Sequence, residues 1–179
     1  MPERVIRISN TAAVGAPGRV EIDAWRFLSA EESAQPLPAG PVVVPLAAWR
    51  ARREELLARG EVGVRLEPED DPFELARDVA ALALIAIHYP KFTDGRGHSS
   101  AVLLRTRLGF EGELRAFGDV GRDQLFQLAR CGFDAFVLAP HRDPQAALAG
   151  LADFSLRYQA SVDDPLPLFR KRLAGRTSP

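Results

Sequence analysis

Cysteine is nearly absent from this chain of 179 residues. Cys131 is the only one, which excludes a disulfide framework and a cysteine-based metal site within one chain. We expect its thiol to pack in the core. Long apolar runs are also missing: no stretch approaches the ~20 residues of a membrane-spanning helix, and residues 1–10 lack the apolar core of a secretory signal. These absences predict a cytoplasmic protein without a membrane partner.

An excess of basic charge is missing too. The formal net charge is −1, which argues against a general nucleic-acid-binding role, because such proteins carry a basic surface. Lysine is rare: among 23 basic residues only Lys91 and Lys171 are lysines. Arginine offers a planar fork that suits carboxylates, phosphate and sulfur oxyanions. A genome rich in arginine codons would give the same bias, so both explanations remain open.

The overall composition is that of a globular protein. Hydrophobic residues make up 46% and charged residues 26% of the chain, as in ordinary soluble domains. A chain of this length forms one domain and buries about two-thirds of its unfolded surface. We therefore expect a single conventional core.

Residues 1–40 predict an N-terminal hairpin and a linker that belong to the same domain. The hairpin would contain a strand near Val5–Ile8, a turn at Gly15–Gly18 and a strand near Val20–Phe27. The stretch SAEESAQPLPAG follows as a linker, because it has prolines and no apolar period. At the other end, residues 163–179 predict a flexible tail with at most one amphipathic piece.

Between residues 41 and 162, strand patterns alternate with helix patterns. About six strands are predicted, the first five at Pro41–Leu46, Val62–Leu66, Leu84–His88, Glu113–Phe117 and Ala135–Leu138 and the last at Leu156–Val162. The helices between them are expected at Ala48–Arg59, from Pro72 to about Ala83, at Ser99–Leu108, Arg122–Cys131 and Gln145–Phe154. Gly60 would end the first, and Asp71 and Asp143 would cap two others. This alternation is typical of an α/β domain with a mostly parallel sheet.

Two architectures fit that alternation. The run GELRAFGDVGRDQLFQLARCGFDAFVL resembles a strand-helix-strand unit of a TIM barrel, but a full barrel needs eight units and ~250 residues. We therefore favour an open sheet flanked by helices, with a partial barrel-like curl as the alternative. Sequential units that all wind the same way would place the helices on one side and favour the curl.

Three runs carry a family resemblance: DGRGHSSAVLLR, GELRAFGDVGRDQL and RCGFDAF. They resemble the bacterial domain of unknown function 934 family, most densely over Val42–Leu138. Genes of this family often lie beside those for sulfite reductase, and members are commonly labelled probable oxidoreductases of sulfite reduction. The resemblance implies a place in reductive sulfur assimilation and assigns no catalytic residue. His98 and Gly121 stand where the family usually has a tyrosine and a bulky aliphatic residue.

Two polar, glycine-containing loops each follow a predicted strand. The first loop is residues 94–100 and the second loop is residues 118–123. The carboxyl ends of parallel strands meet at one edge of a sheet, so we expect both loops to lie together with His88 and residues 139–142. The predicted anion-binding residues are Asp94, Gly95, Arg96, Gly97, Ser99, Arg115 and Arg122. The alternative is a well-capped turn in which an arginine pairs with Asp94 or Asp119.

Three residues near these loops are candidates for proton transfer: Asp119, Asp123 and His98. Both aspartates also stand where carboxylates cap helices, and that alternative remains open. No cluster of histidine and carboxylate residues has metal-ligand spacing, so no metal is predicted. No nucleotide, haem or iron-sulfur motif is present, and the cofactor is left unknown.

Two hypotheses follow from the sequence. The first is a binder of a small oxyanion in reductive sulfur assimilation, with an oxidoreductase activity left open; it predicts a concave site at the strand ends. The second is a non-catalytic accessory protein that docks on sulfite reductase or its electron donor; it predicts a flat or convex edge. An exposed apolar helix face would favour a homodimer over a monomer.

Overall fold

The computed structural model describes residues 4–8, 18–154 and 158–176. Their strands form one sheet in the order β2-β1-β8-β7-β6-β5-β4-β3. The strands are β1 (Arg4–Arg7), β2 (Arg19–Ile22), β3 (Arg26–Phe27), β4 (Val42–Pro45), β5 (Val62–Leu66), β6 (Leu84–Tyr89), β7 (Glu113–Gly118) and β8 (Ala135–Phe136). Strands β3 to β8 are parallel, and β1 is antiparallel to both of its neighbours. The predicted α/β class, mostly parallel sheet and N-terminal hairpin are confirmed.

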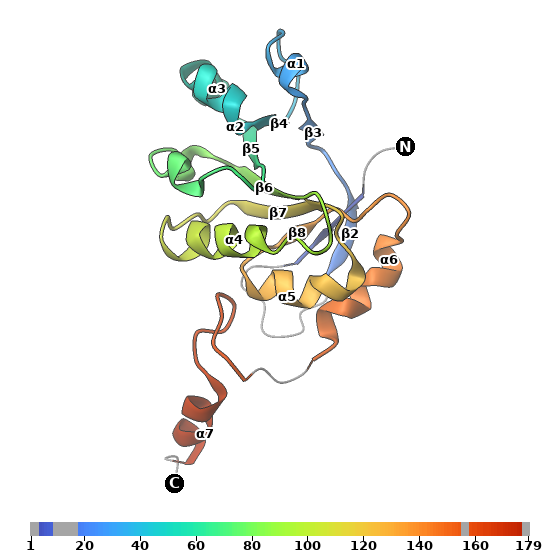
Figure 1. Cartoon of the computed structure of the whole chain (residues 1–179), viewed down its shortest axis with the longest axis vertical. Helices are drawn as coiled ribbons and strands as arrows, with labels where there is room; N and C mark the ends of the chain where they lie inside the picture. Colours follow the sequence, from blue (N-terminus) through green and yellow to red (C-terminus); the bar gives the residue numbers. More distant parts are fainter. Residues whose placement is uncertain (1–3, 9–17, 155–157, 177–179) are drawn as a thin grey trace.

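The sheet is open and curled (Figure 1). From β4 to β8 each strand pairs with the next one in the chain, so the connections wind the same way, and α4 and α5 lie along one side of the sheet in Figure 1. Residues 41–162 contribute five strands, β4 to β8, and not about six, because the strand predicted at Leu156–Val162 does not form in its described part. In the N-terminal part, the segment predicted as one strand at Val20–Phe27 forms two, β2 and β3. The predicted turn at Gly15–Gly18 lies, except for Gly18, outside the described residues.

A short crossing segment explains the curl. β2 and β3 stand at opposite edges of the sheet, yet only residues 23–25 separate them in the chain. In a flat sheet of this size the two edges would be about 33 Å apart. The step from Ile22 to Arg26 spans at most about 14 Å. The sheet must therefore bend until its edges approach each other.

Helices connect most of the strands, and several of them differ in length or position from the sequence prediction. They are α1 (Ala30–Ser33), α2 (Leu46–Ala51), α3 (Arg53–Arg59), α4 (Arg96–Thr106), α5 (Leu125–Arg130), α6 (Pro144–Ala147) and α7 (Leu168–Arg176). Four 3₁₀ turns are η1 (Pro72–Leu75), η2 (Val79–Ala81), η3 (Arg122–Gln124) and η4 (Leu148–Ala152). No helix in these described ranges combines the length and the apolar character needed to cross a membrane.

Several predicted helices are shorter or divided. The helix expected at Ala48–Arg59 breaks at Arg52, which has φ −125° and ψ 27°. The helix expected from Pro72 forms only the turns η1 and η2. The predicted end at Gly60 (φ 66°) and the cap by Asp71, which accepts a hydrogen bond from Phe73 N at 2.9 Å, are confirmed.

The strand predicted at Leu156–Val162 is absent from residues 158–162, and residues 155–157 lie outside the described chain. Instead of joining the sheet, Val162 N donates a hydrogen bond of 3.2 Å to the carbonyl of Arg130 at the end of α5. The amphipathic piece expected in the tail is the helix α7.

Both faces of the sheet are covered by apolar side chains, which belong to separate clusters. Along β6, Ile85 and Ile87 belong to the main core under the helices. Leu84 and Ala86 alternate with them and pack on the inner face of the curl, with Val43. This double burial agrees with the strand pattern, which is apolar on both faces.

The inner face also contains a buried ion pair. Arg115 on β7 is 0% exposed, and its Nη1 lies 2.5 Å from Oδ2 of Asp23, which is 1% exposed. Glu113 accepts a second bond from Arg115 at 2.5 Å, and the Phe27 ring lies 5.8 Å from the guanidinium carbon. The pair therefore ties the crossing segment to the middle of the sheet. Arg115, predicted at an anion pocket on the strand ends, is instead paired inside the curl.

We predict that Asp23→Ala destabilises the protein by about 3–5 kcal/mol, because it leaves the Arg115 guanidinium buried with too little negative charge beside it. Urea unfolding monitored by tryptophan fluorescence measures the loss. Arg26→Ala is the matched control, since it removes an exposed pair with Glu32 from the adjoining strand β3, and it should cost far less. Equal losses in the two variants would contradict the role given to the buried pair.

Candidate functional site

The two loops follow the carboxyl ends of the paired parallel strands β6 and β7 and so lie at one edge of the sheet, as predicted. Asp119 in the second loop accepts a hydrogen bond of 2.9 Å from the backbone N–H of Phe92. Gln124 Nε2 donates to the Phe92 carbonyl at 3.2 Å, and Asp119 N donates to the Tyr89 carbonyl at 2.7 Å. Asp119 therefore fastens the second loop to the segment between β6 and the first loop, and this role is structural.

The first loop is shorter than expected because α4 begins at Arg96, three residues before the predicted start at Ser99. Gly95 precedes the helix, and Asp94 Oδ1 accepts a hydrogen bond of 3.2 Å from the backbone N–H of Arg96, the first helical residue. Gly97 is buried within the first turn, where a Cβ atom would lie 2.7 Å from the ring of Tyr89. Gly97 thus allows α4 to pack closely on β6. Ser99 lies inside the helix and does not cap it.

Arg96 is engaged by carboxylates. It donates to Asp94 Oδ2 at 2.7 Å and to Glu69 Oε1 at 3.0 Å. The hydrogen bond from Arg96 lowers the pKa of the Asp94 carboxyl to about 2. The arrangement matches the alternative in which the loop arginine pairs with Asp94.

Arg122, at the start of η3, has another partner. Its Nη2 donates to Asp153 Oδ1 at 2.7 Å, and about half of its side chain is exposed. The guanidinium groups of Arg96, Arg115 and Arg122 therefore have separate carboxylate partners. They do not share one anion between them in this arrangement.

His98 lies mostly inside the protein. Its Nδ1 is 3.3 Å from the hydroxyl of Tyr89, and the two rings meet edge to face with centroids 5.5 Å apart. Burial lowers the pKa of the His98 imidazole and raises the pKa of the Tyr89 hydroxyl. The imidazole is therefore held in its neutral form near pH 7.

A cavity of about 250 Å³ opens where the second loop meets the loop after β8. Its lining residues are Arg122, Leu138, Arg142, Asp143, Ala146 and Ala147. Asp143 is occupied as the predicted cap of α6, because it accepts from the backbone N–H groups of Gln145 and Ala146 at 3.1 and 3.4 Å. Of the predicted anion-binding residues, Arg122 is the one that lines this cavity.

Arg142 is the unusual side chain of this cavity. It is half-buried, its Nε is buried without a hydrogen-bond partner, and within the described chain its guanidinium has no ion-pair partner. It lies against Gly121: a Cβ atom on Gly121 would be 2.7 Å from Arg142 Nη1 and 2.7 Å from Asp123 Oδ1. Asp123, a predicted acid–base residue, therefore lies on the same side of Gly121 as this guanidinium.

Sequence reasoning did not single out Arg142. Residues 139–142 were expected at this edge of the sheet. The sequence around an arginine in a polar turn, however, does not show whether its guanidinium group will have a carboxylate partner. What distinguishes Arg142 is that it makes no ion pair within the described chain, although Asp123 lies on the same side of Gly121. Whether an ion pair forms depends on every neighbouring element.

A second cluster of polar side chains lies on the inner face of the curl. Of its members, His88 was predicted at the strand ends, whereas Glu67 and Arg65 were not. His88 Nδ1 lies 2.6 Å from Oε2 of Glu67, and its ring stacks on Phe117 with centroids 4.9 Å apart. Arg65 Nε is 3.6 Å from the other oxygen of Glu67. The register of β5 and β6 places Glu67 beside His88, because Leu66 pairs with Ile87 and these are the next residues in the chain. Within residues 4–8, 18–154 and 158–176, no three metal-ligating side chains are grouped as a metal site would require.

Comparison with protein families gives one match. The family model described as "Bacterial protein of unknown function (DUF934)" matches residues 63–169, more than half of the chain. The chain belongs to this family. The matched range includes β5 to β8, both loops, His88 and Arg142. No curated protein and no solved structure matches the chain.

We predict that stability depends on pH through His98. Its pKa in the folded protein is below that of the unfolded chain, so the unfolded state takes up a proton first as the pH falls below about 6.5. The buried Asp134, whose pKa is raised to about 6 by desolvation, acts in the opposite direction in the same range, so the test compares two proteins. The free energy of unfolding of the wild type, taken relative to that of His98→Gln, should fall between about pH 7.5 and about pH 5. Urea unfolding at both pH values measures the difference. An identical fall in both proteins would show that the imidazole is not shielded.

Proposed function

We propose that this protein binds a small oxyanion between Arg122 and Arg142, at the carboxyl edge of its sheet. The observation that carries the proposal is the half-buried side chain of Arg142, which makes no ion pair within the described chain and lines a cavity. A positive charge withdrawn from water is costly unless an opposite charge compensates it. A bound anion would supply that charge.

The cavity supports a small ligand. Its volume of about 250 Å³ is below the range of about 300–1,000 Å³ typical of drug-sized ligands. Arginine forks bind oxyanions through two parallel hydrogen bonds. Leu138, Ala146 and Ala147 supply apolar walls, which strengthen such charged bonds by excluding water. Because Asp143 is engaged by backbone N–H groups, its charge is partly compensated.

The resemblance to the family encoded beside sulfite reductase directs the proposal to sulfur oxyanions, with sulfite and sulfate as the first ligands to test. We place the protein in the cytoplasm, in reductive sulfur assimilation. Asp123 is the predicted acid–base residue nearest to Arg142, and it is the residue we would assign to proton transfer if the bound anion reacts. The proposal itself concerns binding and names no cofactor.

We predict that Arg142→Ala weakens binding of sulfite or sulfate at least about tenfold, because it removes a charge-assisted hydrogen bond. Isothermal titration calorimetry with sulfite, sulfate and phosphate measures the affinities. Arg96→Ala is the matched control, since Arg96 is an arginine of the same sheet edge outside the cavity, and it should bind as the wild type does. Equal weakening in both variants, or no binding by the wild-type protein, would contradict the proposal.

A second variant tests the space around the guanidinium. Gly121→Val should also weaken anion binding, because its side chain would displace Arg142. The backbone at Gly121 has φ −116° and ψ 165°, which valine adopts readily. Thermal unfolding therefore should show a folded variant, and calorimetry should show the lost affinity. Retained affinity in a folded Gly121→Val protein would mean that the anion does not contact Arg142.

A further inference from the structure

The chain ends in an arm that leaves the body of the protein. We call residues 158–176 the C-terminal arm. Its first part is anchored on α5, where Arg130 donates to the Gln159 carbonyl at 2.6 Å and accepts from Val162 N at 3.2 Å. Its last part, α7, extends beyond the other helices (Figure 1). The arm therefore presents surface that the domain itself does not cover.

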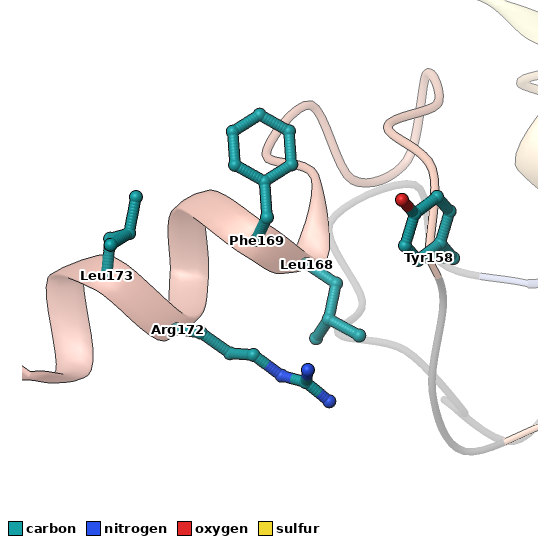
Figure 2. A pocket seen from close by; sticks show the side chains of 5 residues that line it. All are labelled: Tyr158, Leu168, Phe169, Arg172 and Leu173. Atoms are coloured by element: carbon teal, nitrogen blue, oxygen red, sulfur yellow. The ribbon is translucent and has the colours of Figure 1, made fainter.

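Large apolar side chains are exposed on this arm. Tyr158 is 74% exposed, Leu166 52%, Phe169 55% and Leu173 59%. A cavity of about 340 Å³ is lined by Tyr158, Leu168, Phe169, Arg172 and Leu173, whose side chains are shown in Figure 2. Contiguous exposed apolar surface of this kind marks interaction sites.

Basic charge lies beside the apolar residues. Arg170, Lys171 and Arg172 are consecutive in α7. Lys171 pairs with Asp164 on the arm itself. Arg170 and Arg172 have no ion-pair partner within the described chain. Arg172 lines the cavity together with Phe169, so an occupant of the cavity would meet a positive charge among apolar groups.

We propose that the C-terminal arm is a docking surface for an acidic partner protein, whose apolar side chain enters the cavity while a neighbouring carboxylate pairs with Arg172. Apolar contact would supply affinity, and the charge pair would fix the partner's orientation. This interaction is independent of the oxyanion site. It locates docking on the arm and not on the loops at the strand ends.

Charge argues against a second copy of this chain as the occupant. Two arms packed on each other would bring Arg170 and Arg172 of both copies together, and like charges facing each other are unfavourable. The arrangement also differs from that of a helix lying on a membrane, in which the basic and apolar residues occupy opposite faces. Here Arg172 follows Leu168 by four residues and lies on the same face.

Site-specific photo-cross-linking tests the proposal. The full-length protein, carrying a benzophenone amino acid in place of Phe169, is expressed in its natural host, and the cross-linked peptide is identified by mass spectrometry. We expect one partner protein whose cross-linked segment contains apolar residues beside Asp or Glu. The same amino acid in place of Phe73, an exposed residue of the body, is the control and should give no such product.

Binding of the purified partner then provides the quantitative test. Phe169→Ser and Arg172→Glu should each weaken binding at least about tenfold, and raising the salt concentration from about 0.05 to about 0.3 M should weaken wild-type binding. Exchanging the partner's carboxylate for Arg should restore binding to Arg172→Glu. Phe73→Ser should bind normally, and circular dichroism should show that the arm variants remain folded.

Other outcomes would overturn the proposal. A cross-link to a second copy of the chain, with a dimer in size-exclusion chromatography that Phe169→Ser dissolves, would assign the arm to self-association. Flotation of the protein with phosphatidylglycerol vesicles, lost in Phe169→Ser, would assign it to a lipid surface. A partner bound with no dependence on salt or on Arg172, or no cross-linked product at all, would exclude an acidic docking partner.

Discussion

The constraint on which this structure depends is the short connection between the two edges of its sheet. Residues 23–25 join β2 to β3, and this length holds the edges of an eight-stranded sheet far closer than a flat sheet allows. The crossing then passes over the inner face of the curl. There Asp23 meets Arg115, and two charges that would be costly alone compensate each other without solvent.

This closure decides where a ligand can be held. The inner face carries the Arg115 pair, the aromatic contact between Phe27 and Phe117 at 4.9 Å and the bond between His88 and Glu67. Arg115 is thereby withdrawn from the edge where the loops lie. At that edge, Asp94 and Asp153 pair with arginines and Asp119 accepts a backbone hydrogen bond, while Arg142 makes no ion pair within the described chain. This unpaired guanidinium lies in the loop after β8.

The chain thus has two surfaces with different physical properties. The oxyanion site proposed at Arg122 and Arg142 is small and partly enclosed, so it suits a compact anion. The C-terminal arm is exposed and combines apolar with basic side chains, so it suits another protein. The two proposed surfaces are distinct. They can be separated experimentally because they share no residue.

Local structure was largely determined by the sequence. The strand Val62–Leu66, the helix end at Gly60 and the caps at Asp71 and Asp143 were all predictable, because each depends on side-chain periodicity or on hydrogen bonds between residues a few positions apart. The class of fold followed from the alternation of these elements. The position of both loops at the same edge followed from the rule that parallel strands end at one edge of a sheet.

Only the tertiary structure decided how the charges are paired. Arg115 pairs with Asp23, which is 92 positions away in the chain, and α4 begins early because Gly97 packs on Tyr89. Arg142 is distinctive because it makes no ion pair within the described chain, and no local pattern can encode this. Electrostatic compensation depends on distance and burial in three dimensions. The sequence therefore specified the elements and their order, whereas the folded chain determined which guanidinium groups are paired with carboxylates.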